Sequence, residues 1–86
     1  MITKLKDGFE VQIHEDALNS WDFLEMLSDI DEGDYGLIVK VARLLLGKEG
    51  IAMLKEHLKD EQGRVPADVM VTAISELMES ANELKN

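Results

Sequence analysis

Hydrophobic and polar residues alternate near the start of the chain. In the stretch FEVQIHE, Phe9, Val11 and Ile13 fall on one side and polar residues fall on the other. This two-residue period is typical of a β-strand with one buried face, and the aspartate–glycine pair just before it has the chemistry of a hairpin turn. Because an isolated hairpin is barely stable in water, its apolar face must pack on helices. We therefore predict a β-hairpin over residues 2–14.

The length of the hairpin loop sets which residues face each other across the two strands. A two-residue turn would mix apolar and polar residues on each face. A three-residue loop that ends at a left-handed Gly8 places Leu5 opposite Phe9 and Thr3 opposite Val11. That register keeps one face apolar, so we predict the three-residue loop.

From residue 19 onward the apolar residues recur at intervals of three and four, which indicates amphipathic helices. Asn19 or Ser20 can cap the first helix, and Gly47, Gly63 and Pro66 mark points where later helices end or begin. The predicted helices span approximately residues 19–31, 34–46, 48–60 and 66–84. The apolar face of the first helix comprises Trp21, Phe23, Leu24, Leu27 and Ile30. The chain is thus predicted to be of the α+β class, mainly α, with an N-terminal hairpin followed by four helices in a small bundle.

The second predicted helix is apolar on nearly every side, and only Lys40 and Arg43 interrupt it. A helix of this kind is either central in its domain or covered by another subunit. The last helix also carries a continuous apolar stripe. We expect these two helices to supply a partner or self-association surface, and the chain to form a homo-oligomer; the alternative for each residue is a place in the core. The residues of this surface are Leu37, Val41, Leu44, Leu45, Met70, Ile74 and Leu77.

Composition narrows the class of protein. With 86 residues, the chain (1–86) is one small domain whose core is marginal unless partners add to it. It has 18 acidic and 9 basic residues, and the resulting charge of −9 repels nucleic acid and anionic membranes. Without cysteine there can be no disulfide, thiol nucleophile or thiolate zinc site. No apolar stretch reaches the roughly 20 residues of a membrane span, and nothing resembles a signal peptide, so we expect a cytoplasmic protein.

The segment SDIDEGDYGL invites comparison with a calcium-binding EF-hand loop, because acidic residues surround a glycine between two helices. A loop that starts at Asp29 has Gly33 at position five, where an oxygen ligand is needed. Its twelfth position is Lys40, a positive charge where a glutamate should complete the coordination shell. A start at Asp31 fails as well. We interpret the segment as a solvated acidic loop.

Other residues that could carry chemistry are isolated in the sequence. His14 and His57 have no partner at a spacing that suits a metal, and the serines lie in no nucleophile elbow. Ser20 begins a helix, as the phosphopantetheine serine of acyl carrier proteins does. Its neighbours Asn19 and Trp21 do not match that motif, however, and a helix cap accounts for it better. We predict no catalytic residue, no cofactor and no metal, and hence a protein that is not an enzyme.

Two long segments, LKDGFEVQIHEDALNSWDFLEML and LLLGKEGIAMLKEHLKDEQGRVPADVM, carry a family resemblance. They resemble the small tail assembly chaperones of long-tailed phages and prophages of Gram-positive bacteria. The shared pattern runs from a GFE strand through an acidic D-A-L bend to a helix. It continues through L-L-G, an L-K-E-H-L helix and a G-R-V turn to a closing helix. The resemblance covers the chain from Leu5 to about Leu77, and its motifs are helix ends and apolar faces.

The resemblance implies a non-enzymatic role in virion assembly. Such proteins coat the long helical tape measure protein, keep it soluble and help to recruit tail tube subunits. They act in the host cytoplasm and are absent from the mature virion. An apolar groove that accepts the helical stripes of the tape measure protein would suit this role, and the charge of −9 would keep the complex dispersed. The alternative is a small acidic regulatory or DNA-mimic protein that occupies a basic groove of its partner, although the acidic residues are scattered rather than arrayed.

Overall fold

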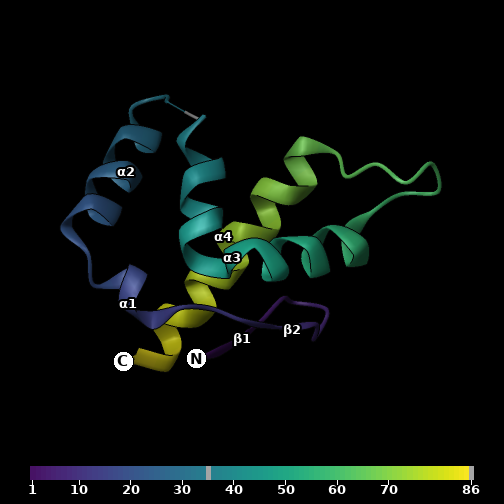
Figure 1. Cartoon of the computed structure of the whole chain (residues 1–86), viewed down its shortest axis with the longest axis horizontal. Helices are drawn as coiled ribbons and strands as arrows, with labels where there is room; N and C mark the ends of the chain where they lie inside the picture. Colours follow the sequence, from purple (N-terminus) through teal and green to yellow (C-terminus); the bar gives the residue numbers. More distant parts are fainter. Residues whose placement is uncertain (35, 86) are drawn as a thin grey trace.

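A two-stranded hairpin leads into four helices, which confirms the predicted fold class (Figure 1). The computed structural model describes residues 1–34 and 36–85, and side chains as far as residue 81. The elements are β1 (Ile2–Lys4), β2 (Glu10–Gln12), α1 (Glu15–Leu18), α2 (Trp21–Asp31), α3 (Leu37–Leu58) and α4 (Ala67–Lys85).

The hairpin has the predicted register. Thr3 pairs with Val11 across the antiparallel strands, and the Leu5 N–H donates to the Phe9 carbonyl over 2.9 Å. Gly8 ends the three-residue loop at a φ of 92°, a conformation that glycine adopts without strain. The Thr3 hydroxyl is buried and donates to the Val11 carbonyl over 2.8 Å. A polar residue on the apolar face is therefore satisfied within its own strand pair.

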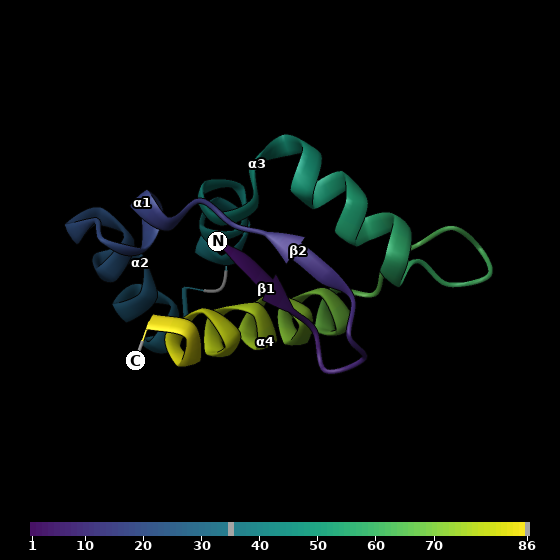
Figure 2. The ribbon, with the colours of Figure 1, turned by 90° about the horizontal axis from the view of Figure 1, so that it is seen from below.

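The two edges of the hairpin lie against different helices (Figure 2). Beside β1, the Lys4 N–H donates to the Ser80 hydroxyl over 3.2 Å and the Lys6 N–H donates to a Glu76 carboxylate oxygen over 2.8 Å. These α4 side chains cap an edge that would otherwise expose unpaired backbone groups. On the other side, β2 packs against α3. The hairpin thus lies between α4 and α3.

Helix α2 begins as predicted but presents a narrower buried face. The Ser20 hydroxyl caps it by accepting from the Phe23 N–H. Phe23 is buried, whereas Trp21 is 72% exposed and Leu24 is 52% exposed, so their predicted place on an inward face is wrong. The reason is geometric, because at 100° per residue these two side chains point well away from Phe23, and α3 covers only one side of the helix.

The predicted break at Gly47, between helices at 34–46 and 48–60, is confirmed. Two helical segments, labelled together as α3, meet there at a sharp kink, where φ is 68° and ψ is 175° (Figure 1). No loop separates the two segments, as the predicted bounds required. The His14 N–H donates to the Leu45 carbonyl over 2.8 Å and satisfies an acceptor that the bend leaves free. The helix begins at Leu37 rather than at residue 34, and Tyr35 lies outside the described residues.

Two further details complete the comparison with the predicted elements. The short helix α1 follows the hairpin directly and was not predicted, because a single turn shows no periodicity. Helix α4 begins one residue after Pro66.

The hydrophobic core forms where the apolar face of the hairpin, α3 and α4 meet. Its buried residues are Leu5, Val11, Ile13, Phe23, Val41, Ala42, Leu45, Leu46, Leu54, Ala73, Ile74, Leu77 and Ala81.

Candidate functional site

The seven residues of the predicted partner surface divide into two groups. Four of them, Val41, Leu45, Ile74 and Leu77, are buried in the core of the chain itself. Leu37 and Met70 are half-buried, and Leu44 is 46% exposed. In this conformation Val41, Leu45, Ile74 and Leu77 therefore belong to the core, which was the alternative to a surface role. The seven residues do not form one continuous surface that faces solvent.

A different apolar surface lies between α2 and α4. Both helices pack against α3, but they are not packed closely on each other, and a groove of about 320 Å³ opens between them. Its lining is apolar except for one carboxylate and one hydroxyl. The residues of this α2–α4 groove are Leu27, Ile30 and Asp31 of α2, Ile38 and Val41 of α3, and Val71, Ile74, Ser75 and Met78 of α4.

The geometry of the α4 wall suits a helical ligand. Val71, Ile74, Ser75 and Met78 occupy positions i, i+3, i+4 and i+7, which form one stripe along the helix. From Val71 to Met78 the wall is two turns, or about 10 Å, long. Apolar helices dock in grooves through anchors with this same spacing.

The apolar surface extends beyond the groove along α2. Leu24 lies three residues before Leu27 and seven before Asp31, so the three side chains share one side of the helix. Trp21, one turn earlier, continues the same side. The exposure of Trp21 and Leu24 is therefore part of one surface that leads into the groove, rather than two unrelated exposed residues.

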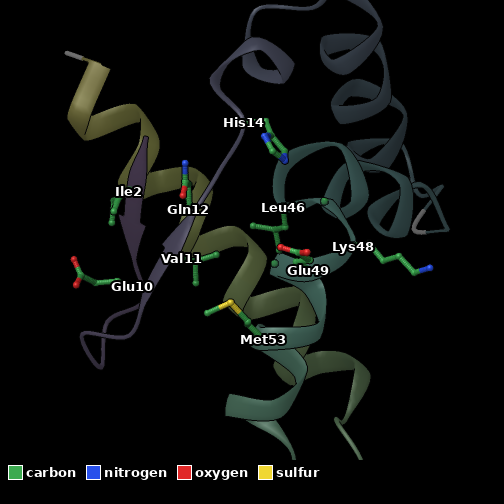
Figure 3. Close-up of a pocket in the computed structure, with 11 residues that line it drawn as sticks. Ile2, Glu10, Val11, Gln12, His14, Leu46, Lys48, Glu49 and Met53 are labelled. Carbon is green, nitrogen blue, oxygen red and sulfur yellow. The ribbon is translucent and has the colours of Figure 1, made fainter.

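A second cavity lies between the hairpin and α3 (Figure 3). This hairpin crevice has a volume of about 550 Å³. Val11, Leu46 and Met53 point into it, whereas Lys48 points away (Figure 3). Polar groups also line it, but no hydrogen bond joins them in the part of the chain that the structure describes.

One cluster of titratable groups lies at the hairpin loop. The His57 ring stacks on Phe9 with centroids 3.9 Å apart, and its Nε2 lies 2.7 Å from an Asp7 carboxylate oxygen. The backbone N–H of Phe9, and then His57, lower the pKa of Asp7 from its ordinary value. These contacts tie the loop to the second part of α3. Asp7 and His57 are exposed and Phe9 is half-buried, and the stacked rings form one side of an open hollow of about 470 Å³ on α3.

The positions singled out for chemistry in the sequence are not brought together. His14 lies over the bend of α3, with Nε2 close to Gly47, and His57 lies on the other part of that helix. Among the described residues, no group of three or more histidine, aspartate or glutamate side chains is placed to hold a metal ion. Within those residues, too, no helix is both long enough and apolar enough to cross a bilayer.

Comparisons of the chain with models of known protein families, with curated proteins and with solved structures find no match. The α2–α4 groove is the feature of the structure that bears most directly on function. Sequence reasoning included Val41 and Ile74 of this groove in its predicted surface. Met78 was assigned to the apolar stripe of the last helix, but neither Met78 nor Val71 was included in the predicted surface, although their seven-residue separation on α4 was a signal that could have found them.

Proposed function

We propose that this protein is a phage tail assembly chaperone, which binds the tape measure protein and keeps it soluble until the tail is built. The observation that supports this most is the apolar α2–α4 groove, whose walls have the spacing that a docked helix requires. Family resemblance supplies the identity of the partner. It also supplies the recruitment of tail tube subunits and the site of action, the host cytoplasm, with the protein absent from the mature virion.

The physical need for such a protein is clear. An unassembled tape measure protein exposes long apolar stripes, and exposed stripes of this size aggregate. A groove that covers two turns of each stripe removes part of that apolar surface from water. The charge of −9 then gives the coated complex a strong mutual repulsion, which opposes aggregation.

Co-expression with the tape measure protein tests the proposal. The gene for the partner is expected beside this one, as a very long helical reading frame downstream, with a tail tube gene upstream. We expect the tape measure protein to be soluble and to co-purify only when this chain is present. A locus that lacks these neighbours, or a tape measure protein equally soluble alone, would count against the function.

A matched pair of variants links the result to the groove. Val69 and Val71 are valines on α4 that are 37% and 38% exposed, and only Val71 lines the groove. We expect Val71→Gln to reduce co-purification strongly and Val69→Gln to leave it close to that of the unchanged chain. Equal losses in both variants would show that the contact lies elsewhere.

The DNA-mimic alternative predicts a different dependence on salt. A contact made by acidic side chains with a basic groove weakens steeply as salt is added, because the charges are screened. Contact through an apolar groove survives moderate salt. Binding to a basic DNA-binding protein that moderate salt abolishes, together with no effect of Val71→Gln, would favour the alternative.

A further inference from the structure

We infer that the α2–α4 groove selects an amphipathic helix whose apolar stripe is flanked by lysine and arginine. The inference depends on the proposed function, because it specifies which segments of a helical partner the groove would take. It is drawn from the distribution of charge around the groove rather than from the apolar lining alone.

The groove is lined by one acid, Asp31, and by no basic residue, and the described side chains of the two helices that form its walls include acids but no bases. The α2 wall with its following loop carries only negative charges over residues 21–34, and the described side chains of α4, 67–81, do so as well. Every lysine and arginine with a described side chain lies on the hairpin, on α3 or between α3 and α4. Of the acids on these two helices, Asp31 lines the groove, and Asp68 and Glu79 lie nearest to its α4 stripe. Glu76 lies on the opposite side of α4, where it accepts from the Lys6 N–H, and Asp22, Glu25 and Asp29 point away from the groove side of α2.

These charges are not neutralised within the described part of the chain. Its ion pairs join Glu15 to the N-terminus, Asp7 to His57 and Glu56 to Lys59, and none involves an acid of either wall. Asp31 itself lines the groove, beside apolar side chains. Asp31 is exposed in the free chain, but a helix docked in the groove would remove part of its water, and a cation on that helix would then attract it more strongly than in bulk water.

The acids at the end of α2 also reduce the stability of the free protein. Asp29 and Asp31 lie in the last turn, Glu32 follows them as the C-cap, and no basic residue lies in that turn. Negative charge at a helix C-terminus is unfavourable, because the unpaired carbonyl groups there are already partly negative. A positively charged ligand along this wall would relieve the repulsion on binding, so binding a basic helix would stabilise α2.

A second copy of this chain does not meet the requirement. The surface of a second copy that most resembles a basic apolar helix is the exposed side of α3. Around that helix, Lys40 and Arg43 lie between the exposed Val39 and Leu44. If this side of α3 docked in the groove of another copy, Lys40 and Arg43 would lie at the apolar centre of the groove, and Val39 and Leu44 would lie at its edges. The approach of two chains of charge −9 would also be opposed by their mutual repulsion.

Two synthetic peptides test the inference with the full-length protein. Each has about 18 residues, so that it can form a helix, and each carries leucines at i, i+3, i+4 and i+7. One has lysine and arginine beside the leucines, and the other has glutamate at the same positions. Affinities of the fluorescently labelled peptides are measured by anisotropy from low to high sodium chloride, and the emission of Trp21 gives a second readout without a label.

A pair of charge variants on α4 localises the effect. Ser75 and Thr72 are both exposed, but only Ser75 lines the groove. Ser75→Lys places a base in the acidic wall, and Thr72→Lys makes the same change of charge on another side of the helix. Circular dichroism of each variant checks that the fold is retained.

We expect the basic peptide to bind at least about tenfold more tightly than the acidic one at low salt, because several rim contacts each contribute modestly. Salt should shrink this preference while part of the binding of the basic peptide persists. Ser75→Lys should weaken binding of the basic peptide by several-fold more than Thr72→Lys does.

Three outcomes would overturn the inference. Equal affinity for the two peptides would show that the groove does not select by charge. Equal effects of the two lysine variants, with complete loss of binding in high salt, would show a diffuse electrostatic contact. No binding of either peptide would show that the groove does not take a helix of this kind.

Co-purification of the tape measure protein is measured in parallel. A soluble tape measure complex with equal peptide affinities would retain the proposed function and reject the charge selection. A clear preference for the basic peptide without any tape measure complex would support the charge selection and reject the proposed function.

Discussion

The substitution Gly47→Ala gives the sharpest test of the bend in α3. At φ 68° and ψ 175° the backbone of Gly47 is in a region that is essentially restricted to glycine, and forcing another residue into it costs about 1–3 kcal/mol. A Cβ at this position would lie 3.0 Å from Nε2 of His14, a contact that the imidazole can relieve by moving. Strain therefore dominates the cost. For 86 residues the total stability is expected to be only about 4–13 kcal/mol, so the loss is a large share.

Urea unfolding followed by circular dichroism at 222 nm measures the effect. With a denaturant slope near 1 kcal/mol/M, the midpoint should fall by roughly 1–3 M. Gly36→Ala is the control, because Gly36 has helical angles of φ −60° and ψ −25° and an added Cβ would meet only Asp34 Oδ1 at 3.8 Å. It should stabilise the protein by about 0.4–1 kcal/mol. Were α3 straight, Gly47→Ala would also stabilise it, by about 1 kcal/mol, and a gain of that sign would refute the bend.

The remaining predictions concern the core, the hairpin loop and association. Leu54 is fully buried, so Leu54→Ala should lower the free energy of unfolding by about 2–5 kcal/mol, whereas Met53→Ala, at a side chain 58% exposed, should change it by under about 0.5 kcal/mol in the same urea assay. The pKa of Asp7 is below its ordinary value of 3.8, so its carboxylate stabilises the hairpin above that pH, and the contribution is lost as the pH falls through the lower folded pKa. In an NMR titration of the Asp7 carboxyl carbon, His57→Ala should raise this pKa part of the way, because Phe9 N–H remains the larger cause; a loss of the shift in His14→Ala as well would exclude the direct contact. Light scattering at micromolar concentration should show the predicted homo-oligomer, and a monodisperse monomer over that range would contradict it.

Local features of this fold were readable from the sequence because local physics decides them. The hairpin register follows from the requirement that Leu5 and Phe9 share an apolar face, and Ser20 is a cap because its hydroxyl can reach the third residue of the helix. Gly47 was correctly placed as a break. The predicted bounds already left no loop there, but the contact of the His14 N–H with the Leu45 carbonyl was not predictable, because it joins distant parts of the chain.

The division between core and surface could not be read in the same way. Trp21 and Leu24 continue the apolar pattern of α2, but they point away from Phe23 and from the side of the helix that packs on α3, so they stay exposed. For α3 the difficulty is greater, since a helix that is apolar on nearly every side does not indicate which side faces the core. The same reason explains why the predicted surface mixed Val41 and Leu45, which are buried, with the exposed Leu44.

The all-round apolarity of α3 has an explanation within one chain. Its first part packs against α1, α2 and α4, its second part packs beside the hairpin, and Ile38 and Val41 form the floor of the α2–α4 groove. What remains exposed on the first part is the strip in which Val39 and Leu44 flank two bases. The helix is therefore central, and its apolarity alone no longer requires a second subunit. Should the predicted homo-oligomer form, Val39 and Leu44, the hairpin crevice and the exposed side of α2 are described surfaces that could make its contacts, and of these three a basic helical ligand would compete for the exposed side of α2.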